Sequence, residues 1–253
     1  MIGVLMRKKL VIICILITSI FLMTSCSRKA ALKTGDITLS NMDDVSAVLA
    51  EHGLHNIDTF ESWVELTDVG KEQFDTSGFD DADCRMTVML LAGKDIKHDK
   101  VEKEYTGSYL MFDMDAIETG GEFSILKPEK QFFATLFGEM PITDGKFENA
   151  FPDNLKKYGI RFTGEGYSVI SVIFKAYEEE EAFVGHTGIL IPNGREYLFI
   201  EKIAFSDPFR VTEVKDEKDL ISFLSERSDY RVEEGEPSPL VYKDDALIGS
   251  LDK

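Results

Sequence analysis

The stretch "VGHTGILIPNGREYLFIEKIAF", residues 184–205, decides the fold because it reads as two β-strands joined by a tight turn. Apolar and β-branched residues flank Asn193 and Gly194, a pair typical of the centre of a type I′ hairpin turn. Counting outward from this turn places His186 directly opposite Glu201. The stretch therefore predicts an antiparallel pair of strands with a histidine and a carboxylate on one sheet face.

Directly opposed side chains in such a pair have Cβ atoms roughly 5 Å apart. A carboxylate at that distance can orient an imidazole, which is the arrangement of a general base. His186 and Glu201 are thus candidate catalytic residues, and the remaining requirement is a nucleophile.

The N-terminus has the features of a targeting segment. "MRKK" is basic, "LVIICILITSIFLM" is apolar, and "MTSC" ends at Cys26 after small residues. This pattern resembles a bacterial lipoprotein signal, which implies a signal peptide over 1–25, a lipid such as palmitate on Cys26, and an extracytoplasmic domain anchored to the cell membrane. An ordinary signal peptide and an uncleaved anchor are the alternatives, and both also place the domain outside the cytoplasm.

The domain boundaries follow from this interpretation. Residues 26–40 are polar and predict a tether, and residues 41–253 predict a single globular domain. A hydrophobic content of 43% is sufficient for such a domain to build a core.

Cys84 is the candidate nucleophile. Of the three cysteines, Cys14 leaves with the signal and Cys26 carries lipid, so no intramolecular disulfide is expected. "GFDDADCRMTVMLLAG", residues 78–93, predicts an aspartate-capped, buried helix with Cys84 in its first turn. The helix dipole there favours a thiolate, whereas the neighbouring aspartates oppose it. A buried, inert cysteine is the alternative.

Helices are predicted to precede a sheet, which indicates an α+β fold. Periodicity and capping residues predict helices at 41–55, 58–74, 128–140 and 147–159, strands at 167–178, 183–191, 196–205 and 209–214, a helix at 216–227, and then a polar tail.

Charge limits the partners. Without the signal's three basic residues the chain has 25 basic and 46 acidic residues, a formal charge of −21, so nucleic acid and bare anionic membrane surfaces are poor ligands for the body. Neither zinc-ligand spacing nor a phosphate-binding loop is found, so no metal and no cofactor is expected.

"DCRMTVML" followed by "GHTGILI" resembles the NlpC-type branch of the papain-like cysteine peptidases. That resemblance implies a papain-like fold, N-terminal helices before an antiparallel sheet, with Cys84 as nucleophile, His186 as base and Glu201 orienting it. The signal, the "DCR" helix, "GHTGILIP" and "LFIEKIAFSDPF" together resemble domain of unknown function 4300, a family of bacterial lipoproteins that implies no activity.

Two functions follow as hypotheses. The first is a cell-surface thiol hydrolase, a peptidase or amidase whose substrate is a peptidoglycan stem peptide or another peptide. The alternative is a non-enzymatic binding lipoprotein on the same fold.

Overall fold

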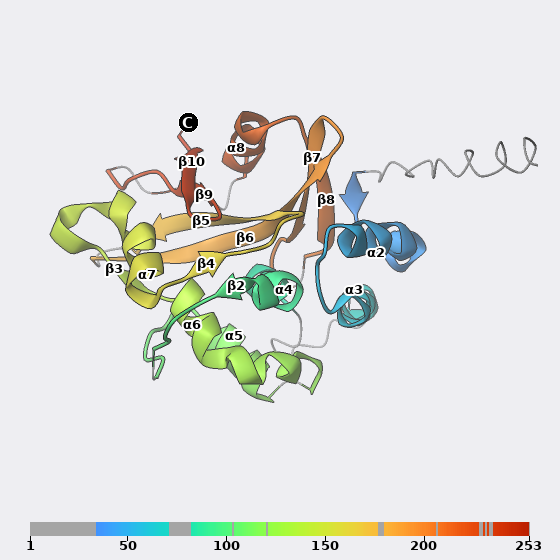
Figure 1. Cartoon of the computed structure of the whole chain (residues 1–253), viewed down its shortest axis with the longest axis horizontal. Coiled ribbons are helices and arrows are strands. Elements are labelled where there is room, and N and C mark those ends of the chain that lie inside the picture. The colour runs from blue at the N-terminus through green and yellow to red at the C-terminus, as the bar shows by residue number, and fades with distance from the viewer. Residues whose placement is uncertain are drawn as a thin grey trace, which may run out of the picture. The chain divides into compact units, whose positions relative to one another are not determined.

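An eight-stranded antiparallel sheet, counted within the described residues, forms the framework of the computed structural model (Figure 1). Its main path runs β1 (Gly35–Asp36), β8 (Phe209–Val214), β7 (Glu196–Lys202), β6 (Glu181–Asn193), β5 (Ser168–Lys175), β9 (Leu240–Lys243) and β10 (Ala246–Ser250). The short strand β3 (Met140–Pro141) also pairs with β6. The structure describes residues 34–70, 82–102, 104–119, 121–176, 180–205, 207–227, 230, 232 and 235–252.

Most of the described helices come before the main strands along the chain. They are α2 (Met42–Glu51), α3 (Ile57–Gly70), α4 (Cys84–Ala92), α5 (Met111–Thr119), α6 (Lys130–Phe137) and α7 (Ala150–Tyr158), and α8 (Glu217–Ser225) follows β8. The strands β2 (Ile96–Lys97) and β4 (Arg161–Phe162) form a separate pair. This order confirms the expected α+β class.

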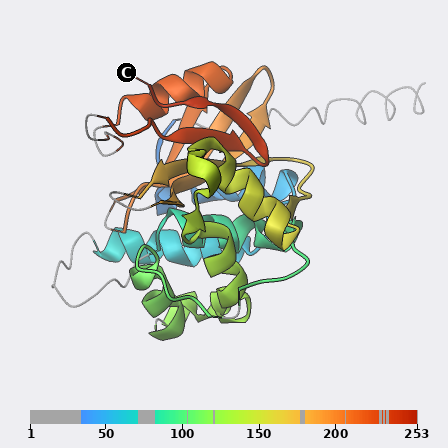
Figure 2. The same ribbon diagram turned by 90° about the vertical axis from the view of Figure 1, so that its left-hand side faces the viewer.

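Helices lie on both faces of the sheet (Figures 1 and 2). Helix α8 covers one face, where Leu220 and Leu224 pack with Leu190 and Phe199 of the sheet. Helices α3 to α6 lie on the other side, and α4 packs against β6 and β7. None of the helices in the described part of the chain has the length and hydropathy of a membrane span.

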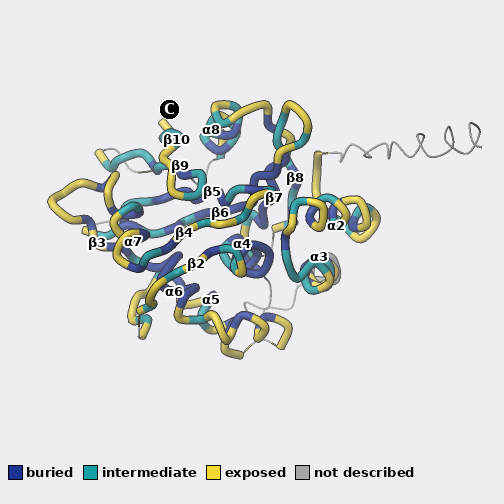
Figure 3. The backbone as a smooth tube through the Cα atoms, in the orientation of Figure 1, coloured by how far each residue is buried: buried dark blue, intermediate teal, exposed yellow. Residues whose placement is uncertain are grey.

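Helix α4 is almost completely buried, as Figure 3 shows. Every residue of its apolar run from Met86 to Ala92 is buried. The Asp83 side chain accepts a hydrogen bond from the Met86 amide at 2.8 Å, which satisfies a donor that the helix itself leaves free. The predicted capped helix is therefore present, and its packing against β6 fixes the position of Cys84.

The turn between β6 and β7 corrects the expected register by two residues. The central turn residues are Gly194 and Arg195, because Asn193 pairs with Glu196. Gly194 has a φ of 68° and Arg195 has a negative φ, as in a type II′ turn, which places glycine first. Direct opposition of His186 and Glu201 was therefore wrong, although a shift of two residues keeps each side chain on its face.

Two segment assignments also differ from expectation. Residues 35 and 36 pair with β8 and Ile37 is buried, so the fold begins inside the segment assigned as a tether, 26–40. The expected polar tail contains the hairpin β9–β10, whose turn includes Asp244 at a φ of 55°. The tail was missed because its strands are short and flanked by charged residues.

Candidate active site at the start of helix α4

Cys84 is the first residue of α4, and only 5% of it is exposed. Asp83 caps the helix, and its side chain accepts hydrogen bonds from the backbone amides of Arg85 and Met86. The positive end of the helix dipole therefore points at the region of the thiol. Cys84 is in the position that the sequence predicts for a nucleophile.

His186 lies in β6 next to a β-bulge. Val172 of β5 pairs with His186 and Ile173 pairs with Val184, which leaves Gly185 as the extra residue. A Cβ on Gly185 would lie 2.5 Å from the Phe174 ring, so this bulge requires glycine. Bulges change the direction of neighbouring side chains, and this one sets the direction of His186.

His186 and Glu201 form a buried pair. The Nε2 atom of His186 is 2.6 Å from Oε2 of Glu201, and the two side chains are 2% and 0% exposed. The two strands pair only as far as Ile189 and Ile200. His186 and Glu201 lie beyond that point and are diagonal neighbours across the two strands. Long side chains reach across a diagonal, which explains the contact despite the corrected register.

Cys84 completes the group by hydrogen-bonding the His186 side chain. Burial disfavours the charged imidazole, but attraction to Cys84, the hydrogen bond that the ring donates to the Cys84 sulfur and the contact with Glu201 outweigh it and raise the pKa of His186 to about 9. His186 is therefore protonated at neutral pH. The structure brings together Cys84, His186 and Glu201, the three residues that the sequence selected.

Glu201 has a second partner that the sequence did not indicate. Arg227, just after α8, places its NH1 atom 2.9 Å from the same Oε2 atom. Burial would raise the pKa of Glu201, but His186 and Arg227 outweigh burial and lower it. The guanidinium also lies over the Tyr230 ring, whose centroid is 5.6 Å from that of His186. Glu201 is thus an ionised carboxylate that holds one nitrogen of the imidazole.

Arg85 and Asp113 are further residues near the thiol that sequence reasoning missed. Arg85 contacts Asp113 through Nε at 2.9 Å and Asp83 through NH2 at 2.8 Å. The "DCR" motif contained Arg85, but its role depends on Asp113, which lies in α5, a helix that the sequence did not predict.

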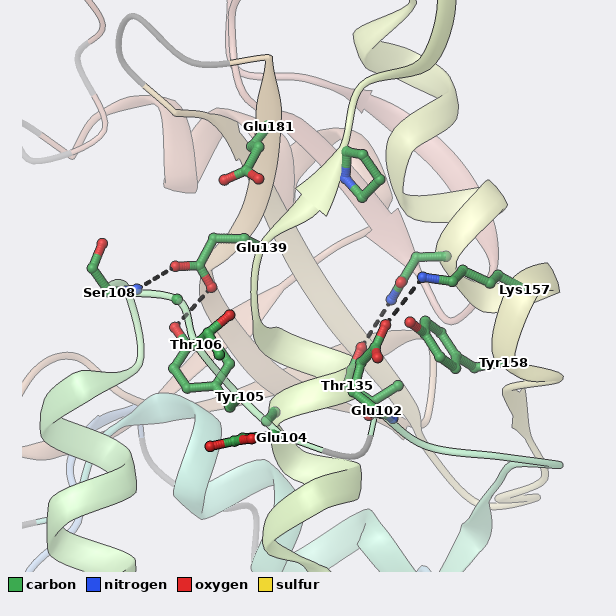
Figure 4. Close-up of a pocket in the computed structure, with 14 residues that line it drawn as sticks. Glu102, Glu104, Tyr105, Thr106, Ser108, Thr135, Glu139, Lys157, Tyr158 and Glu181 are labelled. Atoms are coloured by element: carbon green, nitrogen blue, oxygen red, sulfur yellow. Dashed lines mark hydrogen bonds and ion pairs between the residues drawn. The ribbon is translucent and has the colours of Figure 1, made fainter.

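A polar cavity of about 480 Å³ lies elsewhere, lined by residues of the 102–108 segment and of α6 and α7 (Figure 4). Glu139 faces this cavity, but Ser108, Tyr109 and Tyr105 donate hydrogen bonds to its carboxylate. Glu102 pairs with Lys157 at 3.1 Å. Two of the acidic side chains of this cavity thus bond to other groups of the protein, and none of the three candidate catalytic residues lines the cavity.

Comparison with known proteins assigns a family. A family model described as Domain of unknown function (DUF4300) matches residues 41–248. No curated protein and no solved structure matches the chain. Cys26, the expected lipidation site, lies outside the described residues.

Proposed function

The chain belongs to the DUF4300 family, and we propose that its domain is a thiol hydrolase that cleaves an amide bond. The observation that carries the proposal is the connected group of Cys84, His186 and Glu201 at the start of a buried helix. Such a chain of nucleophile, base and orienting group is the arrangement of covalent acyl transfer.

In this mechanism the Cys84 thiolate attacks the amide carbonyl carbon, and the protonated His186 gives its proton to the leaving amine. Water then attacks the thioester, His186 takes a proton from that water, and the acid leaves as Cys84 regains its thiolate. Glu201 holds the ring through Nε2 during both steps. Because Asp83 holds the amides of Arg85 and Met86, the Cys84 amide is the donor assigned to the developing oxyanion.

The arrangement of a nucleophile helix packed on an antiparallel sheet, with the base on one strand and the orienting residue on the next, supports the papain-like, NlpC-type assignment. With lipid on Cys26, the domain would sit on the outer side of the cell membrane. Peptidoglycan stem peptide, or another peptide in that compartment, is the proposed substrate class.

Burial supports a second candidate, a binding lipoprotein in which these residues only stabilise the fold. Cys84 and His186 are 5% and 2% exposed, and Arg227 already pairs with Glu201. A buried, fully paired histidine needs no substrate to explain it. The two candidates differ in whether the thiol is reactive in the folded protein.

Alkylation by iodoacetamide, followed by peptide mapping to isolate Cys84, distinguishes them. His186→Ala should lower the Cys84 rate about tenfold or more, and Glu201→Gln should lower it less, because Glu201 acts through the ring. His55→Ala is the matched control: it removes a histidine that pairs with Asp95 at 2.9 Å near the opposite end of α4. Equal rates in the native chain and His186→Ala would leave the binding protein as the better interpretation.

A further inference from the structure

Arg85 connects the start of α4 to two other elements. Its Nε and NH2 atoms donate to the two carboxylate oxygens of Asp113 in α5, at 2.9 and 3.0 Å. Its NH1 atom donates to the carbonyl oxygen of Val184 in β6 at 3.2 Å. A single guanidinium thereby links the start of α4 to helix α5 and to strand β6.

The contact with β6 is made at the residue before the bulge. Val184 pairs with Ile173, Gly185 is the extra residue, and His186 then pairs with Val172. Arg85 thus holds the strand where its direction changes, two residues from the imidazole. Cys84 lies at the start of α4 and His186 lies on β6, so this guanidinium connects the two segments that carry these side chains.

Arg85 also compensates two buried carboxylates near the thiol. Asp83 and Asp113 are 3% and 1% exposed. Burial and the charge of Asp83 raise the pKa of Asp113 well above its usual value. Burial acts likewise on Asp83, but Arg85 and the hydrogen bonds to its carboxylate outweigh it and lower that pKa. Removing the guanidinium would leave negative charge uncompensated beside Cys84.

We propose that Arg85 is a positioning residue of this site, which holds the start of α4 against the β6 bulge so that Cys84 meets His186. The inference rests on the proposed function for its catalytic meaning. An ion pair that served stability alone could be replaced by well-packed apolar residues. The three-way contact instead requires the planar, forked guanidinium, which the single ammonium of lysine does not reproduce.

A comparison of backgrounds tests the proposal through the effect of His186→Ala on Cys84 alkylation. In the native chain His186→Ala should lower the alkylation rate about tenfold. Added to Arg85→Lys or to Arg85→Gln/Asp113→Asn, the same substitution should lower the rate by less than about twofold. The double variant removes one of the two carboxylates that Arg85 compensates, and it serves as the second test if Arg85→Gln alone does not fold. Arg161→Gln/Asp99→Asn removes an exposed arginine–aspartate pair of 2.8 Å and should retain the tenfold effect.

An unchanged tenfold effect in Arg85→Lys would overturn the positioning role, because the charge alone would then suffice. NMR titration of the His186 ring gives a second readout that needs no activity. The pKa of about 9 should fall toward about 6.5 in the Arg85 variants, since the Cys84 contact is lost. If the alkylation rate of Cys84 in the native chain does not depend on His186, the hydrolase proposal fails. The titration alone then decides the role of Arg85, and an unchanged pKa of His186 in the Arg85 variants rejects the positioning role.

Discussion

At the scale of single residues, the energetics of the site centre on a charged imidazole inside the protein. Burying a charge is costly unless partners compensate it, and His186 has Cys84 and Glu201 as partners. Glu201 in turn has Arg227 on the same oxygen. The group therefore runs from Cys84 through a charged imidazole and a carboxylate to the guanidinium of Arg227, and a change in any one of them affects the next.

This arrangement predicts that the protein loses stability at alkaline pH. The pKa of His186 is raised from 6.5 to about 9 on folding, so its contribution is complete below about pH 6.5 and is lost as pH rises through about 9. The contribution of His186 to the free energy of unfolding should therefore fall across that window by up to roughly 3 kcal/mol. Urea denaturation at pH 6, 7, 8 and 9.5 measures it.

The control for that series is His186→Asn, which should show a flatter dependence on pH over the same range. His55→Asn replaces a partly exposed histidine outside the site and controls for the substitution itself. Identical slopes for the native chain and His186→Asn would show that the imidazole does not carry its charge into the folded state.

At the scale of elements, the β6–β7 pair depends on a close approach at Gly188. A Cβ there would lie 2.5 Å from the Phe199 ring and 2.9 Å from the carbonyl oxygen of Ile200. Phe199 is fully buried and the carbonyl belongs to the neighbouring backbone, so neither moves easily. The glycine of the "HTG" motif therefore permits the two strands to come together beside the catalytic candidates.

Gly188→Ala should consequently lower the free energy of unfolding by about 1–3 kcal/mol, as overpacking of a filled core does. It should also weaken the His186–Glu201 contact, because the strands must move apart. Gly121→Ala is the matched control, since a Cβ at Gly121 meets no atom within 4 Å and its φ is not positive. Urea unfolding of both variants checks this, and an equal, small effect of the two would contradict the steric explanation.

Local sequence patterns predicted the elements that carry the site, and they failed where a choice depended on the rest of the fold. The capped apolar run gave α4, and the alternating strands gave β6 and β7. The turn was misplaced because "NGR" fits two turn types: a type I′ turn with Asn-Gly at its centre and a type II′ turn with Gly-Arg at its centre. His186 and Glu201 were still brought together, because an error of two residues preserves the face of a strand.

At the scale of the whole molecule, the residues that sequence reasoning missed act across elements far apart in the chain. Arg85 meets Asp113 and Val184, while Arg227 meets Glu201 from beyond α8. No local spacing encodes such contacts, since each arises only when helices pack on the sheet. The start of the domain was also misplaced, because β1 pairs with β8, a strand from near the other end of the chain.

The proposed attachment of the molecule to the cell membrane depends on Cys26. The acidic body, at −21 without the expected signal, would be repelled by an anionic membrane surface, so the charge of the body does not account for the proposed attachment. We expect cells fed an alkyne-tagged fatty acid to label the native protein and Cys14→Ala, but not Cys26→Ala, because the proposed cleavage before Cys26 removes Cys14. Intact-mass analysis should show a mature chain that begins at Cys26 and carries added lipid. Labelling that persists in Cys26→Ala, or an unmodified N-terminus, would exclude the lipoprotein interpretation and leave an uncleaved anchor or a secreted form.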